Sequence, residues 1–216
     1  MPHPTFDNLP QDKRQRLVAA LKTEFARYSF DGASVDRITQ RAGVSKGSFY
    51  QYFLDKQDAY LVAVQDSLER RVAMTDDLGD DASFAERLKS VVLDTQAFQL
   101  ADPLSWEVLV RANSSDAVAV MAAMRNTGDQ VHAWVCDAVR AGVAGGELHP
   151  DLDPDAAAWL VEHTVMGLGE YLLTRFGIPS ARELADADAQ TREDLQQTVC
   201  AVLDMVLRAV GCEEQK

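Results

Sequence analysis

The stretch AGVSKGSFYQYF, residues 42–53, combines a turn, a helix start and an aromatic face, and it contains no acidic residue. Gly43 tolerates the left-handed backbone conformation that a tight turn needs, and Ser45 can cap a following helix that runs through Tyr52. Upstream, Ser34 can cap another short helix that ends at the turn. Two short helices joined by a glycine-containing turn predict a helix-turn-helix, whose second helix enters the major groove of DNA.

The second of these helices carries side chains that suit contacts with a duplex. Lys46 can reach a phosphate or a guanine edge, Gly47 lets the backbone approach closely, and Ser48 can exchange hydrogen bonds with either group. Gln51 can make a bidentate contact with adenine. Candidate phosphate anchors, which fix the register of a protein on DNA without reading its sequence, are Tyr50, Tyr52 and Lys56.

An inner apolar face is expected on the same helix. Phe49 and Phe53 are four residues apart and should pack together against Ile38 and Val44, so the polar residues form an outer face. The alternative is an ordinary short amphipathic helix whose two tyrosines only cover the core. The whole set of residues at this spacing favours DNA contact over that alternative.

Charge is divided unevenly along the chain. The 216 residues carry a formal net charge of −13, yet residues 1–56 hold nine Lys and Arg against six Asp and Glu, a net of +3. Residues 57–216 hold twelve against twenty-eight, a net of −16. An acidic body disfavours nonspecific binding to polyanions, whereas a locally basic head can still approach one.

The length of 216 residues favours one or two domains. Apolar residues make up 47 % of the chain, which is enough for a substantial core. The chain has no run of about 18 apolar residues and its N-terminus has no apolar signal core, so we expect a cytoplasmic protein without a membrane partner. The cysteines lack metal-like spacing, so we expect reduced thiols, no metal and no cofactor. They are Cys136, Cys200 and Cys212.

Periodicity predicts an all-α protein, because nearly every segment has a helical pattern and none alternates as a strand does. Aspartates before Pro103 and Pro154, and Asp116, are expected helix caps. The expected helices are 11–28, 34–42, 45–52, one that Asp55 caps, 82–101, 103–112, 116–143, 154–176 and 191–210.

The ordered motif resembles the TetR family of transcriptional regulators over residues 11 to about 65. The resemblance rests on Phe25, Gly32, Ser34-Val35, Ile38, Ala42-Gly43-Val44-Ser45, Gly47-Ser48-Phe49-Tyr50, Tyr52-Phe53 and Asp55-Lys56. It implies a three-helix DNA-binding head in residues 1–56, followed by a ligand-binding and dimerisation bundle in residues 57–216. Departures at Thr39 and Ala59 indicate packing adjustments. By position, Lys46, Gly47, Ser48 and Gln51 would face bases, and Ser34, Arg37, Ser45, Tyr50, Tyr52 and Lys56 would face phosphates.

Two later helices, 154–176 and 191–210, carry apolar stripes that suit a two-fold, four-helix interface between copies of the chain. Burial of both helices within one subunit is the alternative. The expected interface residues are Leu160, Thr164, Gly167, Leu168, Leu195, Val199, Val202 and Val206.

Large or adaptable side chains on helices of the body predict a pocket for an apolar or aromatic effector, with few polar anchors. Ordinary core filling is the alternative for each of them. The candidates are Phe98, Trp106, Met121, Met124, Trp134, His163, Met166, Glu170 and Tyr171.

The sequence therefore predicts a ligand-responsive repressor that binds a palindromic double-stranded operator as a homodimer and that a small-molecule effector releases. An enzyme on a helical bundle is a second class. The chain has no zinc-protease motif, phosphate-binding glycine loop or nucleophile elbow. His132 and Asp129 are three residues apart on one helix face, but no second such pair is present, as a bundle enzyme with a metal site would need. A protein-interaction module is a third class, and the outer face from Lys46 to Lys56 argues against it.

Overall fold

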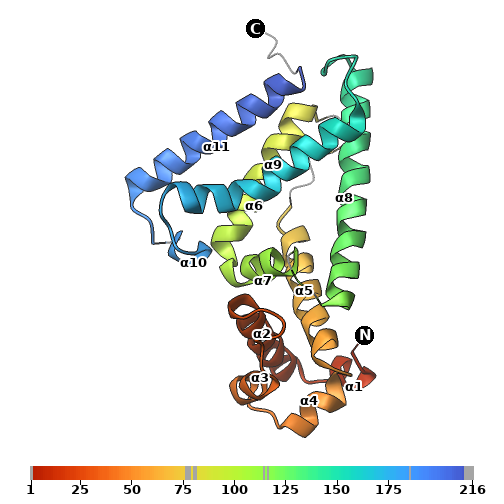
Figure 1. Cartoon of the computed structure of the whole chain (residues 1–216), viewed down its shortest axis with the longest axis vertical. Coiled ribbons are helices and arrows are strands. Elements are labelled where there is room, and N and C mark those ends of the chain that lie inside the picture. Colours follow the sequence, from red (N-terminus) through yellow and green to blue (C-terminus); the bar gives the residue numbers. More distant parts are fainter. Residues whose placement is uncertain are drawn as a thin grey trace. The chain divides into compact units, whose positions relative to one another are not determined.

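The computed structural model describes residues 2–75, 79, 82–113, 115, 117–184 and 186–211, within which every regular element is a helix (Figure 1). The prediction of an all-α fold is thereby confirmed for these residues, while Asp116 and Cys212 lie outside them. Among the described helices, none carries an apolar stretch of the length that a bilayer crossing requires.

The chain forms two compact units, which are described separately. Unit 1 comprises residues 1–73 and 102–127, and unit 2 comprises residues 74–101 and 128–216. Unit 1 contains α1 (Pro4–Asp7), α2 (Gln11–Arg27), α3 (Val35–Ala42), α4 (Lys46–Tyr52), α5 (Lys56–Val72), α7 (Pro103–Asn113) and the first part of α8 (Val118–Ala144). Unit 2 contains α6 (Phe84–Ala101), the rest of α8, α9 (Pro154–Arg175), α10 (Ala181–Leu184) and α11 (Ala189–Ala209).

Helix starts and the turn near the N-terminus form as predicted. Ser34, Ser45 and Asp55 cap α3, α4 and α5, and each side chain accepts a hydrogen bond from the backbone N–H three residues later. Gly43 ends α3 with a φ of 68°, in the left-handed region where a residue with a Cβ is strained. These contacts are local, so a short window of sequence was enough to predict them.

An aromatic core holds α4 in unit 1. Phe49 and Phe53 are fully buried, and their ring centroids are 5.0 Å apart, which confirms the expected inner face. The fully buried Phe6 of α1 lies 5.1 Å from the ring of Phe53. Phe25 of α2 stacks on Tyr60 of α5 at 4.2 Å, so α5 is joined to the same core.

The two units divide the chain differently from the boundary expected after residue 56. Helix α5 packs against α2, and α7 packs against both of them. Ala59, Ala63 and Val64 of α5 are fully buried. The buried face of α5 therefore belongs to the core of unit 1.

A buried carboxylate joins α2 to the start of α3. Glu24 is fully buried, and its Oε1 accepts hydrogen bonds from the backbone N–H of Ser34 and from Nε of Arg37, both at 2.8 Å. Arg37 also donates to the carbonyl of Gly32 at 2.7 Å, and Arg41 lies 3.7 Å from Oε2 of Glu24. Because a buried carboxylate without partners is costly, these contacts favour one packing of α3 on α2.

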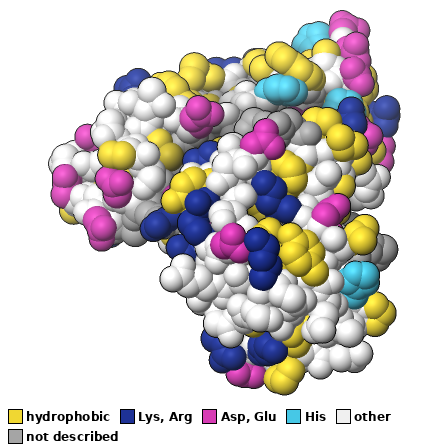
Figure 2. Space-filling view, turned by 60° about the horizontal axis from the view of Figure 1, so that its bottom comes forward, with side chains coloured by type: hydrophobic (Ala, Val, Ile, Leu, Met, Phe, Trp, Pro, Cys, Tyr) yellow, Lys and Arg dark blue, Asp and Glu magenta, His cyan; other side chains and the backbone are white. Residues whose placement is uncertain are grey.

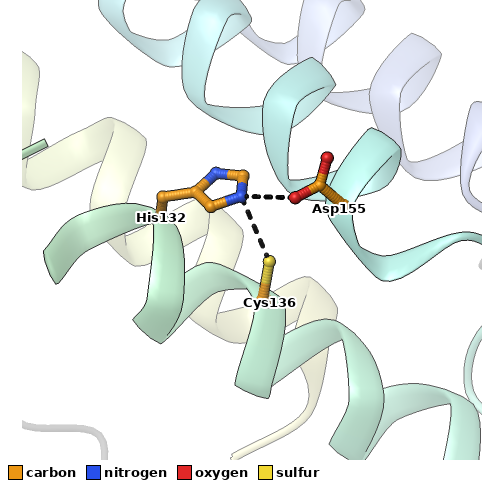
Figure 3. Close-up of side chains that lie close together, drawn as sticks. All are labelled: His132, Cys136 and Asp155. Carbon is orange, nitrogen blue, oxygen red and sulfur yellow. Dashed lines mark hydrogen bonds and ion pairs between the residues drawn. The ribbon is translucent and has the colours of Figure 1, made fainter. Parts of the chain in front are cut away.

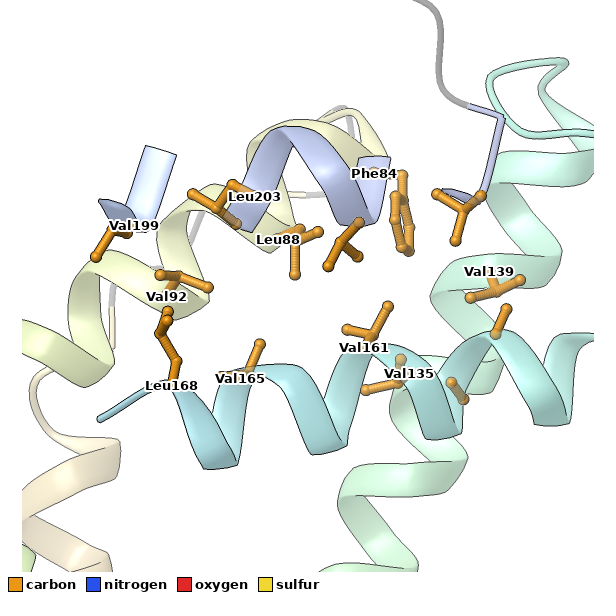
Figure 4. Close-up of a cluster of buried hydrophobic side chains, with 14 of the residues drawn as sticks. Phe84, Leu88, Val92, Val135, Val139, Val161, Val165, Leu168, Val199 and Leu203 are labelled. Carbon is orange, nitrogen blue, oxygen red and sulfur yellow. The ribbon is translucent and has the colours of Figure 1, made fainter. Parts of the chain in front are cut away.

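An apolar cluster in unit 2 receives side chains from α6, α8, α9 and α11 (Figure 4). Four residues expected at a subunit interface, Leu168, Leu195, Val199 and Val206, belong to this cluster. Their burial is therefore explained within one chain, which was the alternative that the sequence left open. Leu160, Thr164 and Val202 are half-buried and Gly167 is exposed.

Substituting Glu24 should loosen the packing of α3. We expect Glu24→Ala to lower the free energy of unfolding by roughly 2 kcal/mol, because Ser34 and Arg37 both lose their acceptor. Urea denaturation followed by circular dichroism measures this change. Asp12→Ala removes an exposed pair with Arg16 and should change stability by less than about 0.5 kcal/mol. Equal effects of the two substitutions would contradict a structural role for Glu24.

Candidate nucleic-acid interface and effector site

Helix α4 directs its polar residues outward because Phe49 and Phe53 occupy its inner side. Lys46, Gly47 and Gln51 are exposed, and Tyr50 is 49 % exposed. Figure 2 brings forward the end of unit 1 that carries α4, and lysine and arginine side chains are present on this face. The expected base-facing residues therefore share an accessible surface, together with the half-buried Ser48.

An ion pair between α3 and α4 positions Lys46. Its Nζ lies 2.9 Å from Oδ1 of Asp36, and both side chains are exposed. The hydrogen bond with Asp36 raises the pKa of Lys46, which further favours the positively charged form of its side chain. Because an exposed pair contributes little stability, Lys46 can exchange Asp36 for a phosphate at small cost.

Two serines expected to contact DNA also bond to each other. Oγ of Ser45 accepts the backbone N–H of Ser48 at 3.0 Å and lies 2.9 Å from Oγ of Ser48. Oγ of Ser34 similarly accepts the backbone N–H of Arg37. These hydroxyls begin the two helices and retain lone pairs or protons for a second partner.

Three expected phosphate contacts have partners within unit 1. The guanidinium of Arg37 binds Glu24 and lies 4.2 Å from the centroid of the Tyr28 ring. Tyr52 is buried, and its hydroxyl accepts a hydrogen bond from Lys13 at 3.0 Å. Lys56 donates to the carbonyl of Ala33 at 3.1 Å. The structure thus gives all three a role in holding the helices together.

Residues near the N-terminus, which sequence reasoning left unassigned, close one end of α4. The backbone N–H of His3 donates to the carbonyl of Tyr52 at 2.8 Å, and the hydroxyl of Thr5 donates to the carbonyl of Gln51. These bonds satisfy carbonyls that the end of a helix leaves open. Pro4 at the first position of α1 was the available sequence signal for this short helix.

A small cavity lies between α6 and α9 in unit 2. Its volume is about 10 Å³, which is room for about one water molecule. Gln99 is only 2 % exposed, and its Nε2 has no hydrogen-bond partner among the described residues. Because an unpaired buried amide is costly, this position is a candidate effector contact that sequence reasoning missed. The lining residues are Val92, Thr95, Gln96, Gln99, Val165, Leu168 and Gly169.

The nine residues expected to bind an effector, all of them described, are not gathered at this cavity. Trp106, Met121 and Met124 belong to unit 1, and the other six belong to unit 2. Phe98 and Trp106 are buried, as core filling would require. The exposed members are His163 and Glu170 together with Trp134, Met166 and Tyr171, whose exposures are 50 %, 52 % and 45 %.

Helices α9 and α11 expose large apolar side chains on the surface of unit 2. Trp159 of α9 is 56 % exposed and stacks on His163, with ring centroids 4.4 Å apart. Met166 continues the outer side of α9, and Met205 of α11 is 62 % exposed. Large apolar side chains that are exposed on one face of a helix, as Trp159 and Met166 are on α9, are typical of an interaction surface.

Comparison with known proteins places the chain among bacterial regulators. Residues 17–61 match the family described as "Bacterial regulatory proteins, tetR family". The crystal structure of a TetR family transcriptional regulator from Chloroflexus aurantiacus J-10-FL is 33 % identical, with coverage of 97 % of this chain and 98 % of that one and a TM-score of 0.78.

Curated relatives agree with this placement. The HTH-type transcriptional regulator SrpR of Pseudomonas putida is 26 % identical over 161 residues, which are 73 % of this chain and 74 % of SrpR. The HTH-type transcriptional repressor Rv1474c of Mycobacterium tuberculosis is 34 % identical over 74 residues, 34 % of this chain and 39 % of that protein. These relatives are regulators of transcription, not enzymes.

The burial of the unpaired Gln99 amide leads to a prediction about the stability of the protein. We expect Gln99→Met to raise the free energy of unfolding by about 1 kcal/mol, because the methionine removes the unpaired donor and keeps most of the volume. Urea denaturation measures the difference. Gln96→Met, a matched change at a half-buried residue of the same cavity, should have a smaller effect. A loss of stability in Gln99→Met would show that the amide has a partner.

Proposed function

Because the chain belongs to the TetR family of transcriptional regulators, we propose that it represses transcription by binding a palindromic operator as a homodimer. We further propose that a small molecule bound in unit 2 releases it from DNA. The observation that carries the proposal is the outer face of α4, where Lys46, Gly47, Ser48, Tyr50 and Gln51 are accessible beside one another. We place the protein in the cytoplasm, where bacterial DNA lies.

The surface of α4 around Gly47 supports close contact with DNA. A Cβ added at Gly47 would have only Oγ of Ser45 nearby, at 3.8 Å, so packing within the chain does not require glycine there. A DNA duplex lying on this surface would explain the glycine, because a larger side chain would hold the helix backbone away from the bases. The net charge of +3 in residues 1–56 favours the same approach.

Repression is the favoured direction of control. The matching protein of Mycobacterium tuberculosis is named a repressor, and a protein that occupies a palindrome can exclude other proteins from it. Two copies related by a two-fold axis would offer two recognition helices to successive major grooves, about 34–36 Å apart. The operator is therefore expected to be a palindrome whose half-sites follow that spacing.

The proposed subunit interface uses the outer sides of α9 and α11. Trp159, Met166 and Met205 are exposed in the single chain, and Gly167 provides a small exposed position at which a partner helix can approach. Half-buried Leu160, Thr164 and Val202 would flank this surface. Leu168 and Val199 would support it from within the core of unit 2.

The proposed effector is mainly apolar and carries one hydrogen-bond acceptor. Val92, Val165 and Leu168 supply apolar walls, and Nε2 of Gln99 supplies a buried donor. Because typical ligand pockets measure about 300–1,000 Å³, α6 and α9 must repack before such a molecule fits. A coupling of about 1–3 kcal/mol between this site and DNA would change operator affinity roughly 5–150-fold.

Operator binding tests the proposal at α4. In vitro selection with purified protein should enrich a palindromic duplex, and we expect Gly47→Ala to weaken binding of it at least tenfold because a methyl group separates helix and bases. Lys46→Ala should also weaken binding, through loss of a phosphate or guanine contact worth about 1–3 kcal/mol. Fluorescence anisotropy at one salt concentration measures both affinities.

Two controls separate this result from a folding defect. Gly47→Ala should unfold at the same urea concentration as the natural protein or a higher one, because alanine favours a helix over glycine. Lys89→Ala removes an exposed lysine of α6 and should leave DNA affinity unchanged. No preference for any duplex over random DNA would refute the proposed function.

Subunit assembly tests the α9–α11 surface. Trp159→Glu should convert the dimer to a monomer, because a charge at an apolar interface must be desolvated without a partner. Sedimentation velocity measures the masses. Val131→Glu changes a comparably exposed apolar residue on α8, 45 % exposed, and should leave the dimer intact. If Trp159→Glu remains a dimer, subunits associate through another surface.

A further inference from the structure

Polar side chains of α8 and α9 form a cluster in unit 2, and Figure 3 shows three of them, His132, Cys136 and Asp155. Glu162 of α9 is the fourth. His132 and Cys136 are one turn apart on α8 and point to the same side. Asp155 lies in the first turn of α9, and Glu162 follows two turns later. Neither the proposed DNA contact nor the proposed effector cavity uses any of these residues.

The donor atoms of three residues converge. Nε2 of His132 lies 3.0 Å from Oδ1 of Asp155 and 3.5 Å from Sγ of Cys136, and all three donor atoms lie within 4.8 Å of one another. Around a tetrahedral zinc ion, nitrogen, sulfur and oxygen ligands lie about 3.3–3.6 Å apart, given metal–ligand distances of about 2.0–2.3 Å. Small side-chain movements would therefore admit one ion between them.

Glu162 supplies a second observation, independent of that convergence. Its Oε1 lies 3.0 Å from Nδ1 of His132, on the opposite side of the ring, and the Glu162 side chain is 15 % exposed. A carboxylate that accepts the Nδ1–H leaves the Nε2 lone pair free to bind a metal and fixes the orientation of the ring. Such a carboxylate–histidine pair is the usual outer support of a zinc ligand.

The donor set selects the class of metal. A thiolate and an imidazole favour zinc and similar transition metals over magnesium or calcium, which prefer oxygen ligands. Cys136 is buried, while the side chain of Asp155 is 84 % exposed, so the cluster is closed on the thiol side and open to water beside the carboxylate. This exposure provides an entry path for the ion.

We propose that His132, Cys136 and Asp155 bind one zinc ion, that Glu162 orients His132, and that a water molecule completes the tetrahedron. The sequence expectation of no metal depended on the spacing among cysteines. It considered His132 only together with Asp129, and it did not pair His132 with the cysteine one turn later. Asp155 and Glu162 could not be assigned to the cluster before the packing of α9 against α8 was known.

Protons and a metal ion compete for the same donor atoms of this cluster. The hydrogen bond to Asp155, together with Glu162, raises the pKa of His132, and burial raises the pKa of the Cys136 thiol. A zinc ion binds the thiolate and the neutral imidazole, so it would take the place of the thiol proton of Cys136. Release of protons should therefore accompany binding.

Metal titration of the purified, metal-free full-length chain tests the proposal. Isothermal titration with zinc chloride should show one site per chain. Cobalt(II) chloride should give a blue tetrahedral complex with a thiolate charge-transfer band in the near ultraviolet. Asp155→Asn and Cys136→Ser should each weaken zinc binding at least tenfold, and Cys136→Ser should also remove the charge-transfer band.

Matched controls distinguish this cluster from other donors. Cys200→Ser changes an exposed cysteine of α11, and His163→Gln changes an exposed histidine of α9 whose Nδ1 contacts the carbonyl of Trp159. Both variants should bind zinc as the natural protein does. Asp155→Asn alters a side chain that is 84 % exposed, so we expect the variant to fold and to test the site even if Cys136→Ser unfolds. Absence of a stoichiometric site, or undiminished binding by Asp155→Asn, would overturn the proposal. These readouts do not involve DNA, so they are independent of the proposed repressor function.

Discussion

The interactions of the buried Glu24 carboxylate hold the helices that carry the proposed DNA-binding surface. The carboxylate sits inside unit 1 and accepts hydrogen bonds from the backbone of Ser34 and the side chain of Arg37. Because a buried carboxylate without partners is costly, these bonds favour one position of the start of α3 against α2. Gly43 then ends α3 in a turn that leads into α4, so the placement of Lys46 and Gln51 depends in part on a carboxylate that is itself fully buried.

Basic and aromatic residues around the turn at Gly43 have two roles, one structural and one at the surface. Arg37, Tyr52 and Lys56 direct their polar groups to other parts of unit 1, where they satisfy a carboxylate, a lysine and backbone carbonyls. Lys46 and Tyr50 stand outside, and the only ion pair of Lys46 in the described residues is an exposed one. The first three side chains hold the helices in place, and the other two remain accessible to a new partner. This division suits a surface that keeps its shape while its exposed side chains replace water with phosphate.

Unit 2 combines an apolar interior with two polar features that its packing does not require. Gln99 places an unpaired amide beside the cavity between α6 and α9, and His132 gathers Cys136 and two carboxylates between α8 and α9. Both features connect α9 to a neighbouring helix. A ligand or ion at either one would therefore change how α9 is held, which is a physical basis for regulation.

The sequence by itself determined the helix starts, the glycine turn and the inward side of α4, because capping and helical periodicity involve residues within a few positions of one another. It also determined the family, since the motif around Gly43 is local. Only the tertiary structure decided that Tyr52 is buried, that Val199 lies in the core of one chain, and that Asp155 and Glu162 reach His132. These outcomes depend on contacts between residues 20 or more positions apart, and helical periodicity does not specify which neighbour a helix will meet.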